Sequence, residues 1–258
     1  MQDNAELLAL VNTPTQAALL ADIETRLSEG QGFTIATLNL DHLVKLRENA
    51  AFRAAYSQHS HVVADGRPVV WLRRLSGRPV ELVPGSDLID PLMALAARLD
   101  VPVAFLGSTE TTLATAAERL EAAHPGLRVV TRIAPPFGFD PDGPEGMTAL
   151  NALAASGAKL CLLALGAPKQ ERLAARAARH LPRCGFVSIG AGLDFIAGSQ
   201  QRAPVWVRRV ALEWLWRMLS DPRRLKTRYV KCALLMPKLS WQAMRIQRTG
   251  IIWDGKHD

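Results

Sequence analysis

The chain has 258 residues, of which 48% are hydrophobic and 21% are charged. This length and composition allow a large core in one domain, with or without an appendage, and exclude a mainly disordered protein. The net charge of +7 is unevenly spread: residues 202–248 hold 12 basic and two acidic side chains, whereas residues 1–201 hold 18 basic and 20 acidic ones. We therefore predict a near-neutral body over residues 1–200 and a basic segment over residues 201–258.

Short β-rich runs alternate with segments of helical period along the first 200 residues. This alternation is typical of an α/β domain built around a parallel sheet. The predicted strands cover residues 33–38, 61–64, 101–106, 127–131, 159–165 and 185–189. The predicted helices cover residues 41–57, 86–99, 109–123 and 168–180, with Ser86 as the N-cap of the second and Pro168 in the first turn of the last.

After Pro204 the strand–helix rhythm stops. Tryptophan, arginine, leucine and methionine then fill two helical stretches, which Asp221-Pro222 separates. We expect an α-helical C-terminal appendage with intermixed basic and aromatic residues. It has three readings: a membrane-surface helix, a nucleic-acid-binding segment or a buried helix pair. The interleaved tryptophans favour the membrane surface, and no nucleic-acid-binding module is recognisable.

The cysteines and the N-terminal residues indicate the cellular compartment. Cys161, Cys184 and Cys232 occur without a CxxC motif or paired histidines, which argues against disulfides or structural zinc and favours a reducing cytosol. The first residues lack the basic region of a signal peptide, and no run of 18 apolar residues occurs. We expect a chain that neither crosses a membrane nor is exported by the usual route.

Glycine turns follow three of the predicted strands, at Gly107-Ser108, Gly166-Ala167-Pro168 and Gly190-Ala191-Gly192. Helix N-termini at such turns present free N–H groups to anions, so a phosphate-bearing ligand is one reading. None of the turns matches GxGxxG or GxxxxGK[ST]. Ordinary tight turns are the other reading.

Polar residues also follow strands. Asp65 projects from the end of a predicted strand, either as a general base or as part of an Asp-Gly turn. Thr37 and Asn39 end the first strand and could instead cap the next helix. Gln170 and Glu171 open a helix near the presumed crevice, although a first-turn Glu is also good helix chemistry.

A Pro/Gly-rich stretch over residues 134–144 predicts a functional or connecting loop. Its Asp140-Pro141-Asp142 matches the DxD motif that binds metal in many glycosyltransferases. Two aspartates beside proline are more often a turn, so we predict no metal site here.

Together these motifs resemble the WecG/TagA/CpsF family, glycosyltransferase family 26. The matching segments run in family order over about residues 33–230 and include Thr37-Leu38-Asn39, Ala64-Asp65-Gly66, Gly85-Ser86-Asp87-Leu88, Gly166 to Glu171, Gly190 to Gly198, Arg202-Ala203-Pro204 and Glu213-Trp214. The resemblance implies a Rossmann-like, inverting glycosyltransferase of the hexosyl or N-acetylmannosaminyl type. Its donor would be a UDP-sugar and its acceptor a sugar on undecaprenyl diphosphate.

The resemblance also implies residue roles. Asp65 would be the catalytic base, with Thr37, Asn39 and Gln170 in the same pocket. Donor binding is expected from Gly107, Ser108, Phe137, Gly166, Lys169, Glu171, Gly190 and Asp194. Acceptor and membrane binding are expected from Arg202, Arg217, Arg223, Arg224 and Arg228.

The implied location is the cytoplasm, peripheral on the anionic inner face of the cytoplasmic membrane. We expect no cofactor and no nucleic-acid partner, and a homo-oligomer is left open.

Members of the family commonly carry an Arg shortly before the turn at Gly85. This chain has none there, so a neighbour such as Arg78 would have to replace it. Residues 65–71 favour the GumM-like exopolysaccharide subgroup. The alternative function is a nucleotide-sugar-binding protein of the same fold without catalysis.

Overall fold

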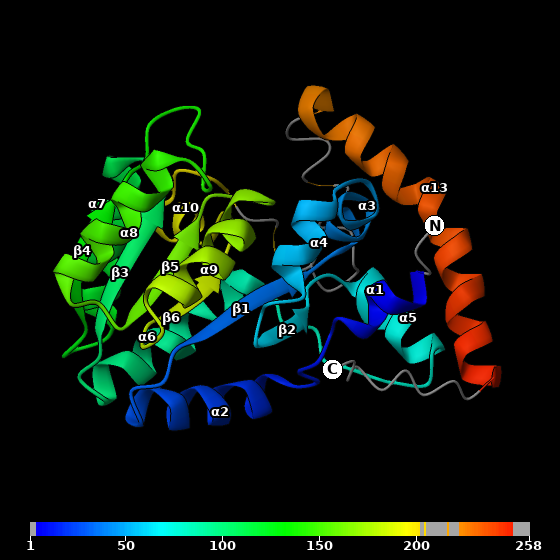
Figure 1. Ribbon diagram of the computed structural model, residues 1–258, viewed down its shortest axis with the longest axis horizontal. Coiled ribbons are helices and arrows are strands. Elements are labelled where there is room, and N and C mark those ends of the chain that lie inside the picture. The colour runs from blue at the N-terminus through cyan, green and yellow to red at the C-terminus, as the bar shows by residue number, and fades with distance from the viewer. Residues whose placement is uncertain (1–3, 202–203, 205–215, 217–221, 250–258) are drawn as a thin grey trace.

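Six parallel strands form one sheet in the order β2-β1-β6-β5-β3-β4 (Figure 1). The structure is a computed structural model, and it describes residues 4–201, 204, 216 and 222–249. The strands are β1 (Phe33–Leu38), β2 (His61–Ala64), β3 (Pro102–Gly107), β4 (Arg128–Ile133), β5 (Leu160–Ala164) and β6 (Gly185–Ser188). The predicted α/β fold with an all-parallel sheet is confirmed.

Twelve helical segments surround the sheet or connect its strands in the described part of the chain. They are α1 (Asn4–Ala9), α2 (Gln16–Ser28), α3 (Leu40–Glu48), α4 (Ala50–Tyr56), α5 (Arg67–Leu75), η1 (Gly85–Asp87), α6 (Ile89–Arg98), α7 (Glu110–Ala123), α8 (Pro144–Ser156), α9 (Lys169–His180), α10 (Gly192–Ala197) and α13 (Pro222–Thr249). No described helix is both long and apolar enough to span a bilayer.

Both faces of the sheet are buried except at the edge strand β4, because alternate residues of the other strands enter different cores. Ile35, Phe105 and Val187 pack with α2, α6, α7 and α10 on one face. Ala36 packs with α3, α4 and α5 on the other face, and Phe186 packs there with α8 and α9. This two-sided burial explains why the strands read as continuous apolar runs.

Side-chain caps set several helix starts. Asn39 and Asn49 each accept a backbone N–H three residues ahead, so they cap α3 and α4 in turn. The predicted single helix over residues 41–57 is therefore two helices. Ser86 is not an N-cap as predicted, because residues 85–87 form a 3-10 turn and the side chain of Ser86 bonds Asp87 instead. Pro168 precedes α9 after a cis peptide bond rather than lying inside its first turn.

The long helix α13 packs against α1, α3 and α5 (Figure 1). Its inner side chains Cys232, Leu235, Leu239 and Ala243 are buried in the same core as the residues of α1. Each fully buried leucine contributes about 1.5–3 kcal/mol to the free energy of unfolding. The division of the chain near residue 200 stays a prediction, since most of residues 202–221 lie outside the described part.

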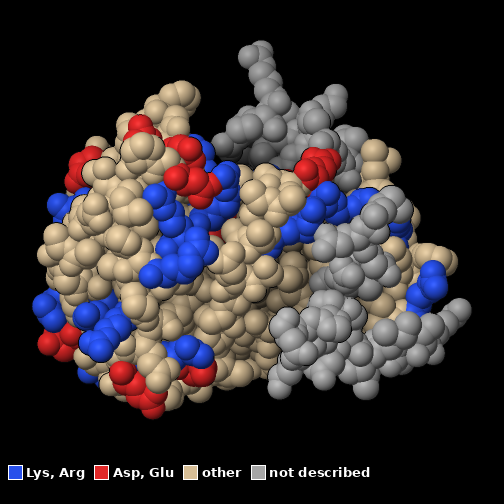
Figure 2. Space-filling view, in the orientation of Figure 1, with Lys and Arg blue, Asp and Glu red and all other residues tan. Residues whose placement is uncertain are grey.

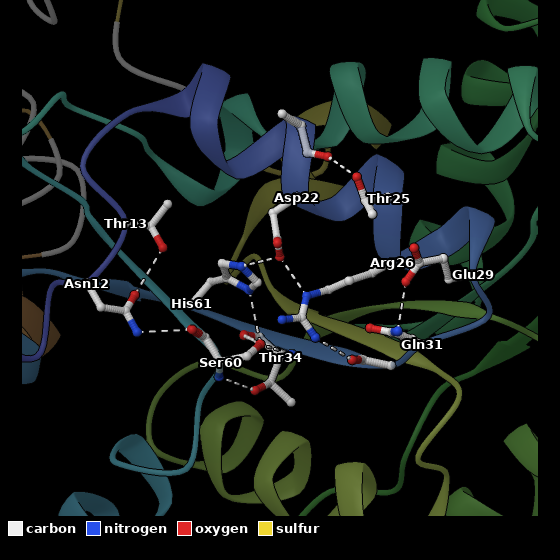
Figure 3. A network of polar contacts seen from close by, with 12 residues as sticks. Asn12, Thr13, Asp22, Thr25, Arg26, Glu29, Gln31, Thr34, Ser60 and His61 are labelled. Atoms are coloured by element: carbon white, nitrogen blue, oxygen red, sulfur yellow. Dashed lines mark hydrogen bonds and ion pairs between the residues drawn. The ribbon is translucent and has the colours of Figure 1, made fainter. Parts of the chain in front are cut away.

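A polar network fastens α2 to the β1–β2 side of the sheet (Figure 3). The Asp22 carboxylate accepts from Arg26 at 2.5 Å and lies 2.8 Å from His61 Nε2, whose Nδ1 is 3.0 Å from Ser60 Oγ. These residue types match a Ser-His-Asp triad, but Ser60 Oγ also bonds the backbone N–H and C=O of Thr34. The serine is committed to joining strands, so the network is structural.

Candidate active site

The carboxyl ends of the central strands enclose the candidate site, because the chain leaves neighbouring strands toward opposite faces. β3 leads to α7 on one face and β5 leads to α9 on the other. Likewise β1 leads to α3, whereas β6 leads to α10. Open α/β sheets bind ligands where the connections diverge in this way.

Asp65 lies at the carboxyl end of β2, beside the end of β1. Its backbone N–H donates to Leu38 O at 2.8 Å, and the parallel register pairs Leu38 with Ala64. Gly66 follows with φ of +94°, a conformation that favours glycine, and it begins α5. Asp65 is half-buried. The fold therefore places Asp65 and Asn39 just after the paired strand ends Ala64 and Leu38, and the role of Asp65 as a base stays a prediction.

Thr37 and Asn39 lie on either side of Leu38 in the sequence and make different contacts. Thr37 is 4% exposed within β1, and its Cγ2 would lie 3.3 Å from a Cβ on Gly85. That Cβ would also lie 3.2 Å from Ser188 O, so the glycine lets the Gly85 turn pack closely against β1 and β6. Asn39 Oδ1 accepts from His42 N at 3.0 Å. The capping alternative thus holds for Asn39, while Thr37 is part of the strand.

Gln170 joins two strand ends. Its Oε1 accepts from the backbone N–H of Gly166 at 3.2 Å and of Gly190 at 3.1 Å, and its Nε2 donates to Glu171 Oε1 at 2.8 Å. Gln170 is 2% exposed and Glu171 is 0% exposed. Oε2 of Glu171 has no hydrogen-bond partner in the described part of the protein. Both residues therefore lie beneath the surface of the site rather than on it.

A polar cluster from α3 and α4 adjoins this pair, in which Asp41, His42 and Tyr56 are buried and Lys45 is partly exposed. Lys45 Nζ donates to Ala167 O at 3.0 Å and forms an ion pair with Asp41 at 2.8 Å. His42 Nδ1 lies 3.0 Å from the Tyr56 hydroxyl. Sequence reasoning did not assign roles to these four residues. The i,i+4 spacing of Asp41 and Lys45 was the available signal, but their contact with the loop after β5 needs the tertiary fold.

Gly107, Ser108 and Asp194 meet at the end of β3. A Cβ on Gly107 would lie 2.3 Å from Ala164 O, so only glycine allows the strands to approach here. Ser108 Oγ donates to Asp194 Oδ1 at 3.0 Å, and Ser199 Oγ lies 3.3 Å from the same oxygen. These contacts join the starts of α7 and α10, and they bring together three residues predicted for the donor.

The loop over residues 134–143 is fixed at its base and open at its tip. Arg176 donates to the carbonyls of Pro141 and Gly143, both at 2.9 Å, and Arg172 forms an ion pair with Asp142. Asp140 Oδ1 accepts the N–H of Asp142. The DxD segment is therefore engaged as a turn, and the described residues contain no cluster of three metal-ligating side chains. Phe137 is fully exposed.

The remaining predicted residues lie at the start of α9, after α5, on α13 or outside the described part of the chain. Lys169 begins α9 and is half-buried. Arg78 lies beyond the carboxyl end of α5, whose other end begins beside Asp65, and it neighbours the buried Arg73. Arg223, Arg224 and Arg228 belong to the first turns of α13. Arg202 and Arg217 lie outside the described residues.

Burial raises the pKa of the Glu171 carboxyl to about 7, against the lowering effects of the Gln170 hydrogen bond and the Lys45 charge. The folded protein therefore holds a proton that the unfolded chain releases near pH 4.5. The stability contributed by this proton is complete below pH 4.5 and is lost as the pH rises to about 7, by about 3 kcal/mol.

Glu171→Gln should remove this part of the pH dependence, because an amide stays neutral. We expect urea unfolding of the wild type to show a larger loss of stability between pH 5 and 8 than unfolding of the variant. Glu118→Gln, at an exposed position of α7, is the matched control and should behave like the wild type. Equal pH dependence in Glu171→Gln and wild type would contradict the assignment.

Comparison with known proteins finds a matching family and related curated proteins. The model of the Glycosyl transferase WecG/TagA/CpsF family matches residues 7–249. An N-acetylglucosaminyldiphosphoundecaprenol N-acetyl-beta-D-mannosaminyltransferase from Bacillus spizizenii strain W23 is 28% identical over 201 residues. That alignment covers 78% of this chain and 76% of the Bacillus protein.

Proposed function

Because the chain belongs to the glycosyl transferase WecG/TagA/CpsF family and is a glycosyltransferase, we propose that it transfers a sugar from a UDP-sugar, with inversion, to a sugar on undecaprenyl diphosphate. The name of the Bacillus relative supports the lipid-linked acceptor. The observation that carries the proposal is the position of Asp65 beside Thr37 and Asn39, at the carboxyl ends of β1 and β2.

In the proposed reaction the Asp65 carboxylate removes the proton of an acceptor hydroxyl. The hydroxyl oxygen then forms a bond to the anomeric carbon of the donor sugar, while the bond from that carbon to the diphosphate breaks and UDP leaves. A single displacement from the opposite side inverts the anomeric centre. The half-buried position of Asp65 suits this role, since a base must reach substrate and yet be shielded from bulk water.

The donor is proposed to lie over the ends of β3, β5 and β6. Helices α7, α9 and α10 begin there, and α7 and α9 are long enough for their N-termini to attract a diphosphate. Ser108 and Asp194 are already fixed to each other at this edge. The exposed ring of Phe137 is available for contact with the nucleotide or sugar.

Donor phosphates are proposed to be neutralised by helix N-termini and basic side chains, so transfer should survive EDTA with little change in rate. The measurement is initial rate with and without chelator. A complete loss of activity that Mg²⁺ or Mn²⁺ restores would contradict this and would require Asp140 and Asp142 to leave their present contacts.

The lipid end of the acceptor is proposed to meet α13 at the inner face of the cytoplasmic membrane. The outer surface of this helix exposes Leu234, Trp241 and Met244 beside Lys238 and Arg245. The Arg245 guanidinium lies 4.9 Å from the centre of the Trp241 ring. Apolar, aromatic and basic groups on one exposed helix face are typical of interfacial binding.

Other basic side chains extend this surface. In Figure 2, Lys and Arg side chains gather over α3, α4 and α13. The basic residues in the sequences of α3 and α4 are Lys45, Arg47 and Arg53. Anionic lipids attract each well-placed basic residue by about 1 kcal/mol. The basic residues of α13 and its preceding segment, among them Arg202, Arg217, Arg223, Arg224 and Arg228, are proposed to bind lipid and acceptor diphosphate.

The purified protein should be assayed with a panel of UDP-sugars and short-chain lipid-diphosphate sugar acceptors. Transfer from one UDP-sugar, with inversion at the anomeric carbon, is the expected result. The panel includes hexoses and N-acetylmannosamine, and a hexose donor would favour the exopolysaccharide subgroup. Binding of a UDP-sugar without transfer to any acceptor would favour the catalytically inactive alternative.

A further inference from the structure

Three of the four hydrogen-bonding directions of the Gln170 side-chain amide are directed inward. Its oxygen receives two backbone N–H groups and its nitrogen donates to Glu171, while the residue is 2% exposed. A group with these contacts has little capacity left for substrate. Its contribution to the proposed reaction should therefore come from what it holds in place.

The two N–H groups belong to loops that leave neighbouring strands. Gly166 follows β5 and Gly190 follows β6, and the two strands pair directly. Both glycines have positive φ, +71° and +57°, and a Cβ on either would meet nothing within 4 Å. Glycine is thus needed at both positions for its backbone conformation rather than for its small size. In this conformation both backbone N–H groups donate to the same oxygen, Gln170 Oε1.

Glu171 and the two glycine N–H groups together favour one orientation of the amide. If the amide of Gln170 were reversed, its NH₂ would face two N–H donors and its oxygen would face the Glu171 carboxyl. The fully buried Glu171 side chain offers an acceptor at 2.8 Å that favours the observed orientation. Lys45, which bonds the carbonyl of Ala167 in the same loop, fixes that loop from α3.

We infer that Glu171 is a positioning residue that acts through Gln170, orienting its amide so that the amide oxygen joins the loops after β5 and β6. The catalytic part of this inference rests on the proposed function, because these loops lead into α9 and α10 at the donor end of the site. The joining of the loops itself does not depend on the reaction.

The test exchanges the amide at position 170 with the carboxyl group at position 171. In Gln170→Glu two carboxyl groups face each other, and their repulsion should keep one proton between them to a pH above 7. At pH 9.5 we expect both to be ionised, so that the donor to Glu171 is lost. In the double variant, Gln170→Glu with Glu171→Gln, the new carboxylate at position 170 accepts both glycine N–H groups and an NH₂ from position 171. The pair keeps its total charge and its hydrogen-bond pattern, so the double variant should rescue the single one.

The main readout is backbone amide hydrogen exchange over residues 165–170 and 189–192, without substrate. We expect roughly tenfold faster exchange in Gln170→Glu at pH 9.5, which corresponds to the loss of one charge-assisted hydrogen bond, and near-normal exchange in the double variant. Gln31→Glu is the matched control, because Gln31 donates to Glu29 at 2.7 Å in an exposed pair. It should leave exchange in both loops unchanged.

If Gln170→Glu fails to fold at pH 9.5, the comparison moves to pH 5.5. There one proton shared between the two carboxyls restores a donor, so the single variant should approach the double one. Single and double variants that exchange equally fast at pH 9.5, or a single variant with normal exchange at that pH, would overturn the inference.

Transfer activity supplies the second readout. The double variant should recover most of the kcat that Gln170→Glu loses. Restored loop protection without restored kcat would overturn the positioning role in catalysis, because it would show that the amide of Gln170 itself contacts substrate. If the wild type transfers no sugar at all, the proposed function fails, whereas hydrogen exchange still decides whether Glu171 positions Gln170.

Discussion

Replacing Asp65 by asparagine is expected to lower kcat by about 10²–10⁴ while UDP-sugar binding is retained. Asparagine keeps the size and much of the hydrogen bonding of aspartate, but it cannot take the proton of the acceptor hydroxyl. Because the backbone N–H of residue 65 bonds Leu38 O in either case, the turn before α5 should keep its shape. The measurements are steady-state transfer rates and calorimetric UDP-sugar binding.

A matched control is Asp100→Asn. Asp100 lies before β3 at φ of +51°, a conformation that asparagine tolerates well, and its carboxylate pairs with Arg128 at the surface. This variant should transfer sugar at the wild-type rate. Near-normal kcat in Asp65→Asn would show that the base lies elsewhere, and Asp194, which accepts from Ser108, would be the next residue to test.

Changing the exposed face of α13 is expected to release the protein from anionic liposomes. The variant combines Lys238→Glu and Arg245→Glu with Trp241→Ser. At about 1 kcal/mol for each basic residue, two charge reversals should weaken liposome binding by 10²-fold or more, with a further loss from the tryptophan. Wild-type binding should also weaken as salt is raised, because exposed charges are screened. Sedimentation with liposomes measures both effects.

Point changes are a sharper test than truncation after Gln200. Truncation would remove Leu235 and Leu239 from the core and expose the side chains of α1, α3 and α5 that they cover. A control variant, Lys159→Glu with Arg183→Glu, reverses two exposed charges near the amino ends of β5 and β6. If the α13 variant binds liposomes as well as this control does, membrane docking through α13 is wrong.

The strands were predictable because burial on both faces leaves continuous apolar runs, and β1 and β2 begin and end where the sequence indicated. Helix boundaries were harder. Asn49 interrupts the segment after β1 with a second side-chain cap, which a count of apolar spacings does not reveal. Helix α5 was not predicted, although Val69 and Leu72 have the spacing of a helix face and both are buried.

For the site, the ends of strands indicated which residues would gather but not their contacts. Asp65 and Asn39 were expected together, and the register of β1 and β2 places them so. The burial of Gln170 and Glu171 was not predictable, since it depends on the approach of α9 to α4 and on the loop after β6. The contact of Lys45 with Ala167 spans 122 positions of sequence and needs the complete sheet order.

The shared core of α1 and α13 also sets an order for folding. One apolar cluster uses residues from Leu19 to Leu193 and another uses residues from Ala104 to Phe186, so both are complete once about three quarters of the chain has been synthesised. The third joins Leu7 to Ala243 and must wait for the last helix to leave the ribosome. Until then the chain carries an uncovered apolar surface, which makes incomplete chains prone to aggregation and to capture by chaperones.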